Sequence, residues 1–174
     1  IAPCFDNPYL SSLEDAANLP RPDTSVAMTT DSFVVTPLFF PGGDIGKLAV
    51  FGTANDLAVS GAKPLYLTLA MIIEEGLPLE TLEKVLQSVA EAASQLQLPV
   101  VTGDTKVVPH GAVDKLFLNT TGVGELIDGA PGGPTTLEVG DRLIVSGPIG
   151  RHGIAVLAAR ENLGFSPPPQ SDCA

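Results

Sequence analysis

The sequence predicts an α/β (α+β) fold in which one mixed β-sheet packs against helices. Strand-like and helix-like segments follow one another in mixed order along the 174 residues. Residues 64–73 (PLYLTLAMII) form a continuous apolar run between Pro64 and Gly76, which is typical of a buried strand. The apolar residues between Leu79 and Leu96 recur at the spacing of one helical face.

The first strand is predicted at residues 25–35, where alternation separates two faces. One face holds Val26, Met28 and Thr30, and the other holds Thr29, Asp31 and Phe33. Next, PGG at 41–43 interrupts the chain, and Asp44 can cap a helix that stops near Gly61. Gly52 lies inside this helix, which indicates close packing or the approach of a ligand.

The second helix is the clearest in the sequence. Pro78 opens it, it runs through residues 79–97, and Pro99 ends it. Two further strands are predicted at residues 100–108 (VVTGDTKVV) and 115–126 (KLFLNTTGVGEL).

The remaining segments carry weaker patterns. Residues 13–19 (LEDAANL) suit another strand or an extended arm. Residues 141–150 suit a strand and loop, and residues 152–163 suit a last helix. A proline triplet at 167–169 is typical of a linker.

Composition limits the partners and the compartment. The formal net charge of −11 argues against a nucleic-acid groove and an anionic membrane surface, but not against phosphates bound through Mg²⁺. No apolar run is long enough for a membrane span. Cys4 and Cys173 are the two cysteines, and two thiols in a reducing cytoplasm are the preferred interpretation over a disulfide. We therefore expect a cytoplasmic protein.

Four aspartates interrupt otherwise apolar or small-residue segments: Asp15, Asp31, Asp56 and Asp104. A buried carboxylate must be paired, hydrogen-bonded or bound to a metal, and converging carboxylates need a cation between them. Mg²⁺ with nucleotide phosphates would complete such an arrangement. Each aspartate by itself also suits an ordinary role, as a turn cap or a solvated side chain.

The strand at residues 100–108 carries two charges between flanking valines. Alternation places Thr102, Asp104 and Lys106 on one face, and Val101, Thr105 and Val107 on the other. One interpretation has the first face lining a cleft and the second packing in the core. The alternative is an Asp104–Lys106 ion pair on an exposed face.

Other catalytic motifs are weak. The segment FPGGDIGK (40–47) lacks the spacing of a phosphate-binding P-loop, although glycines before a helix can offer N–H groups to an anion. His110 and His152 are isolated, and we interpret both as ordinary residues.

Several blocks of the sequence strongly resemble the HypE family of hydrogenase maturation factors, within the AIR synthetase (PurM-like) superfamily. The resemblance covers nearly the whole chain, from LEDAA to SDCA. The blocks that carry it occur in the family's order: TTDSF (29–33), FFPGGDIGKLAV (39–50), NDLA (55–58) and TGDTKVV (102–108).

The resemblance implies a PurM-like N-terminal domain whose sheet pairs across a homodimer into a barrel. It also implies ATP and Mg²⁺ at the dimer interface. The implied reaction is the ATP-dependent dehydration of an S-carbamoyl group on the C-terminal cysteine to a thiocyanate, which supplies cyanide for [NiFe]-hydrogenase iron. HypF would donate the carbamoyl group, and the HypC–HypD complex would accept the cyanide.

Motif by motif, the resemblance also implies site residues. Those implied to hold Mg²⁺ are Asp15, Asp31, Asp56 and Asp104. ATP and its phosphates would contact Thr30, Lys47, Asn55, Asp56 and Asp104. Lys106 matches the lysine assigned to catalysis beside the carbamoyl group.

The sequence departs from the family in what it lacks. A glycine-rich stretch before Ile1, the second domain and the tail with the modified cysteine are all absent. We therefore expect a fragment: residues 1–140 form the ATP-binding and dimerisation domain, and residues 141–174 form a linker and the start of the next domain. By itself it should not complete the reaction. The alternatives are another ATP-dependent superfamily member, such as a thiamine-phosphate kinase, and a module for dimerisation or docking only.

Overall fold

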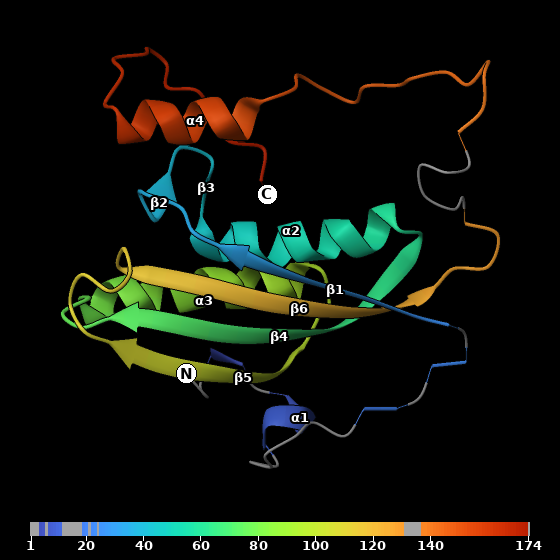
Figure 1. The fold of residues 1–174 in the computed structure, drawn as a ribbon, viewed down its shortest axis with the longest axis horizontal. Helices are drawn as coiled ribbons and strands as arrows, with labels where there is room; N and C mark the ends of the chain where they lie inside the picture. The colour runs from blue at the N-terminus through green and yellow to red at the C-terminus, as the bar shows by residue number, and fades with distance from the viewer. Residues whose placement is uncertain are drawn as a thin grey trace.

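A four-stranded mixed sheet forms the centre of the fold (Figure 1). The structure is a computed structural model that describes residues 4–5, 7–11, 19–20, 22–23, 25–130 and 137–173. In sheet order, the strands are β1 (Val26–Phe33), β6 (Leu116–Leu126), β4 (Ala62–Glu74) and β5 (Val100–Val108). Strands β4 and β5 are parallel, whereas the other two pairs are antiparallel. The predicted mixed sheet and its four strands are therefore confirmed.

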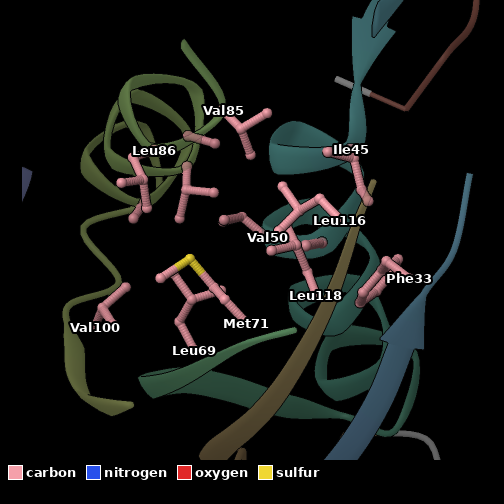
Figure 2. Packing of buried hydrophobic residues seen from close by; sticks show 14 of the residues in the cluster. Phe33, Ile45, Val50, Leu69, Met71, Val85, Leu86, Val100, Leu116 and Leu118 are labelled. Atoms are coloured by element: carbon pink, nitrogen blue, oxygen red, sulfur yellow. The ribbon is translucent and has the colours of Figure 1, made fainter. Parts of the chain in front are cut away.

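Two helices cover one face of this sheet, α2 (Ile45–Val59) and α3 (Leu79–Gln95) (Figure 1). Asp44 caps α2 as predicted, because its carboxylate accepts hydrogen bonds from the N–H groups of Gly46 and Lys47. The core lies between this helical layer and the sheet (Figure 2). Its buried residues include Phe33, Ile45, Val50, Leu69, Met71, Val85, Leu86, Val100, Leu116 and Leu118.

The opposite face of the sheet, which we call the open face, lies away from α2 and α3. Cross-strand pairing places four threonines in one row across it: Thr30, Thr121, Thr68 and Thr102. Near this row, the side chain of Met28 on β1 is 73% exposed.

Smaller elements surround the ends of the sheet. They are α1 (Pro8–Ser11), the two-stranded hairpin of β2 (Phe39–Phe40) and β3 (Gly43–Asp44), and α4 (Arg151–Arg160). The last helix lies beside β2, where the rings of His152 and Phe40 meet edge to face at 5.4 Å. The guanidinium of Arg160 donates to the backbone oxygen of Thr36 at 2.9 Å.

The structure differs from the predictions for residues 141–146 and for strand β5. Residues 141–146 form no strand, and the side chains of Leu143 and Ile144 are 93% and 91% exposed. A strand needs a neighbour to pair with, and none of the described strands pairs with this segment. In β5, Val107 is 67% exposed, so the prediction that this face packs throughout in the core is wrong for its second half. The reason is that β5 is an edge strand, and α2 lies over β1, β4 and β6.

The segment at residues 13–18 lies outside the described residues. Cys4 and Cys173 are free thiols, as preferred from composition. Among the described helices, none has the length and apolar character needed to cross a membrane.

Candidate functional site

Two of the predicted aspartates lie at the β1 edge of the sheet. The register pairs Asp31 with Thr120 and Phe33 with Leu118. Because Thr120 and Leu118 are buried under α2, Asp31 is on the helical side of the sheet. Asp56 projects from α2, and its Oδ2 accepts a hydrogen bond of 3.1 Å from the hydroxyl of Thr29 on β1. Strand β1 and helix α2 therefore bring Asp31 and Asp56 to the same edge.

The neighbouring polar residues divide between the two faces. Asn55 precedes Asp56 on α2 and is exposed. Thr30 lies on the open face instead, where its hydroxyl donates to the backbone oxygen of Thr120 at 3.1 Å and accepts from Thr121 at 3.0 Å. Successive side chains on a strand point to opposite faces, so Thr30 is turned away from Asp31.

Lys47 lies in the first turn of α2, where its backbone N–H donates to Asp44 at 3.0 Å. Nine residues separate it from Asp56, which is about 13.5 Å along the axis and half a turn around it. The structure therefore does not place the Lys47 side chain beside Asp56.

Asp104 and Lys106 lie together at the other edge of the sheet. Their partners on β4 are Ala70 and Ile72, so both side chains are on the open face with Thr102, as alternation predicts. Lys106 Nζ is 3.6 Å from Asp104 Oδ2, and the two side chains are 70% and 61% exposed. Within one chain, the exposed ion pair considered as the alternative is what the structure contains.

The two pairs of site residues are thus separated within one chain. Strands β1 and β5 are the two edges of the sheet, about 14 Å apart across three strand spacings. Asp31 and Asp104 also lie on opposite faces. In the described part of the chain, no three acidic, histidine or cysteine side chains form a group that could hold a metal ion. Asp15 lies outside the described residues.

The glycines before α2 accommodate another part of the chain. A Cβ atom on Gly42 would lie 2.6 Å from the backbone nitrogen of Ser171, and one on Gly43 would lie 2.3 Å from the sulfur of Cys173. Ser171 is buried, and its N–H donates to the Pro41 oxygen at 2.8 Å. Close packing of the C-terminal segment therefore accounts for this glycine pair.

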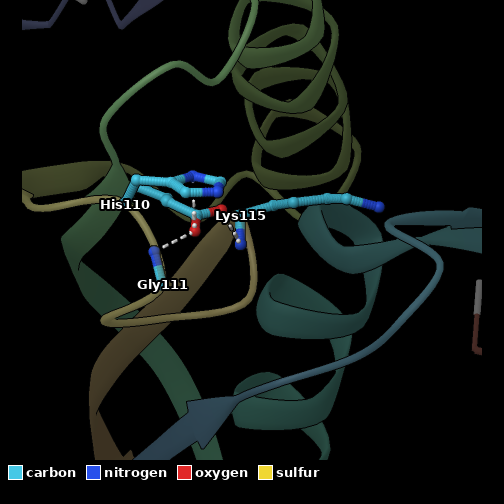
Figure 3. Close-up of polar contacts among 4 residues, drawn as sticks. His110, Gly111 and Lys115 are labelled. Atoms are coloured by element: carbon cyan, nitrogen blue, oxygen red, sulfur yellow. Dashed lines mark hydrogen bonds and ion pairs between the residues drawn. The ribbon is translucent and has the colours of Figure 1, made fainter.

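A cavity that sequence patterns did not indicate lies where β4 and β5 end. It has a volume of about 560 Å³, and its lining includes Leu38, Leu77 and Glu74. The Glu74 carboxylate accepts N–H groups from Gly111 at 2.6 Å and Lys115 at 3.0 Å. Figure 3 shows Gly111, Lys115 and His110 around these contacts.

These two N–H groups, that of Gly111 above all, lower the pKa of Glu74. His110 Nδ1 lies 3.2 Å from the same carboxylate. His110, which has no partner in the sequence pattern, therefore has one in the structure. The arrangement holds the loop between β5 and β6 against the end of β4.

Both the sequence and the fold of this chain are similar to those of known proteins. Residues 13–126 match the family model "AIR synthase related protein, N-terminal domain". The chain is 53% identical over 175 residues to carbamoyl dehydratase HypE of Escherichia coli (strain K12), covering 98% of this chain and 52% of that protein. A crystal structure of E. coli HypE superposes on 99% of this chain and 55% of that one, with a TM-score of 0.95 and 51% identity.

Two further solved structures are similar over almost the entire chain. HypE in complex with ATP matches with a TM-score of 0.88 and 48% identity, over 99% of this chain and 51% of that one. HypE in a HypE–HypF complex matches with a TM-score of 0.83 and 54% identity, over 98% and 55%. The chain thus spans about half the length of the relatives it matches.

Proposed function

Because the chain belongs to the AIR synthase-related family and, within it, to the HypE proteins of hydrogenase maturation, we propose that it is the ATP-binding half of a carbamoyl dehydratase. The observation that carries this proposal is identity near 50% over nearly all of the chain, including relatives named for that activity. One similar protein was solved with ATP and another with HypF.

The reaction proposed for the whole protein removes water from an S-carbamoyl group on a C-terminal cysteine. An amide oxygen is a poor leaving group, and transfer of a phosphoryl group from ATP allows it to leave as phosphate. Loss of the two amide protons then yields the thiocyanate. HypF is the proposed carbamoyl donor, and a HypC–HypD complex the proposed cyanide acceptor.

The residues at the β1 edge fit Mg²⁺ bound to phosphate. Mg²⁺ in nucleotide sites takes one or two carboxylates and completes its shell with phosphates and water. Asp31 and Asp56 supply carboxylates at one edge, and neither forms an ion pair with a lysine, arginine or histidine of the described chain. We expect these two residues to hold the ion and Asn55 to contact a phosphate. Asp15 is a further proposed ligand of the ion, because its LEDAA segment resembles that of the family.

Asp104 and Lys106 lie too far from that edge to join it in one chain, and a second copy could supply them. We expect two copies to pair their sheets so that their open faces line a barrel. Pairing would cover the exposed Met28 and the threonine row, and would bring Lys106 of one copy toward the β1 edge of the other. In that site, Asp104 would bind phosphates through the ion, and Lys106 would stabilise charge on the carbamoyl group.

Residues 141–174 are proposed to begin a second domain. Leu143, Ile144, Val145 and Ile149 expose most of their apolar surface. Such a run is typical of a segment that packs against further structure.

Calorimetry with Mg²⁺ and ATP tests the nucleotide site, and sedimentation tests the dimer. We expect the chain to bind as a dimer, and Asp56→Asn to bind at least about tenfold more weakly because it removes a metal ligand. Asp128→Asn, outside the proposed site, is the matched control. If the chain dimerises and neither it nor the variant binds, the docking-module alternative holds and the proposed site is wrong.

A further inference from the structure

The hydrogen bond between Thr29 and Asp56 joins the edge strand to the helix at the proposed ligand edge. The Thr29 hydroxyl donates to Asp56 Oδ2 at 3.1 Å, across 27 residues of sequence. Thr29 is half-buried, whereas Asp56 is exposed. Among the described residues, no other side chain or backbone group donates a hydrogen bond to the Asp56 carboxylate.

Packing fixes the strand and the helix on which these two residues lie. A Cβ atom on Gly52 would lie 3.0 Å from the ring of Phe33, so β1 and α2 are in close contact there. Gly52 and Asp56 are one helical turn apart on the same side of α2. Thr29 and Phe33 are both on the helical face of β1, and Asp31 lies between them. The contact with Thr29 therefore belongs to a packed strand–helix pair.

We propose that Thr29 is a positioning residue that holds the Asp56 carboxylate in its ligand-binding orientation. An exposed aspartate otherwise samples several rotamers, whereas the β-branched Thr29 side chain has few. A bond to Oδ2 selects one rotamer and leaves Oδ1 for the cation. Groups that orient a metal-binding carboxylate in this way affect metal affinity without touching the metal.

The proposal rests on the proposed function and concerns Thr29, whereas the family resemblance implied a contact between Thr30 and ATP or its phosphates. The structure separates the two threonines, because Thr29 shares with Asp31 the face that is directed toward α2, whereas Thr30 lies on the open face.

Three variants of the full chain test the proposal by calorimetry with Mg²⁺ and ATP and by thermal unfolding. Thr29→Val removes the donor while keeping the shape, and we expect about tenfold weaker binding. Thr29→Ser restores the donor and should return the affinity to within about twofold. Ser60→Ala is the matched control, because the Ser60 hydroxyl donates to the Asp56 backbone oxygen at 2.8 Å and not to its carboxylate. It should leave affinity unchanged.

The outcomes separate this inference from the function on which it rests. If wild type binds and Asp56→Asn does not, but Thr29→Val binds like wild type, then the positioning role is wrong and the site stands. Equal loss in the valine and serine variants would also overturn it, because the hydroxyl is then not the cause. If wild type itself does not bind, both proposals fail. The ¹³C carboxyl resonance of Asp56 should shift in Thr29→Val and recover in Thr29→Ser.

Discussion

The hydroxyl of Ser88 lies 2.7 Å from both carboxylate oxygens of Asp44, and this contact joins the start of α2 to the middle of α3. Both residues are buried, and Asp44 also accepts two backbone N–H groups as the helix cap. The contact ties the loop that carries Gly42 and Gly43 to the helical layer.

Replacing Asp44 with alanine should lower the free energy of unfolding by about 2 kcal/mol or more, because it removes a helix cap and leaves the buried Ser88 hydroxyl without its acceptor. Urea denaturation measures this loss. Gln87→Ala is the control on the same helix, since Gln87 bonds only the exposed Glu91 in the described structure. An equal effect in the two variants would contradict the role of the buried contact.

The Glu74 carboxylate should stabilise the fold in a pH-dependent way. The N–H groups of Gly111 and Lys115 lower its pKa below the usual 4.5, so the folded state favours the ionised form. The unfolded chain therefore takes up a proton at higher pH than the folded chain does. This contribution is complete above the usual pKa and is lost as pH falls through the lowered one.

We therefore expect wild type to exceed Glu74→Gln in unfolding free energy at pH 7, and the difference to shrink below about pH 4.5. Urea titrations between pH 7 and pH 3 measure it, with Glu75→Gln as the control. Amide exchange at Gly111 should also accelerate in Glu74→Gln. A difference that is constant with pH would show that packing, and not ionisation, causes it.

The glycine in the middle of α2 should resist a substitution that usually stabilises helices. Glycine to alanine in a helix interior commonly gains up to about 1 kcal/mol. At Gly52 the new methyl group would lie 3.0 Å from the Phe33 ring, so we expect Gly52→Ala to destabilise by about 1 kcal/mol or more. Gly153→Ala in α4 is the matched control, because nothing lies within 4 Å of its added Cβ. Thermal unfolding should move the two variants in opposite directions.

Lys106 should matter for the reaction and not for stability. Its ion pair with Asp104 is exposed, so Lys106→Ala should change the free energy of unfolding by less than about 0.5 kcal/mol. In a protein that also carries the second domain and a carbamoylated tail, mass spectrometry should show loss of one water on addition of ATP. The variant should lose most of this conversion, while Lys84→Ala should retain it. Unchanged conversion in Lys106→Ala would remove Lys106 from the catalytic site.

Local patterns in the sequence were sufficient for much of the fold. The apolar run at residues 64–73 lies within β4. Strand β5 spans residues 100–108, which are the bounds predicted from its flanking valines. The Asp44 cap and the close packing of Gly52 also follow from residue type. In each case the cause is local, because periodicity, caps and glycines act over a few residues. The same alternation placed Thr29 with Asp31, but the motif drew attention to Thr30.

The sequence by itself determined the four strands of the sheet and the two helices that cover it, the face of each strand to which a side chain belongs, and the family. Only the tertiary structure decided that Asp31 and Asp104 lie on opposite edges and opposite faces of one sheet, and that Thr29 contacts Asp56. Strand order depends on pairing between segments far apart in the chain, which local preferences do not encode. The same reason explains residues 141–146, whose apolar pattern suits a strand but which pair with no described strand.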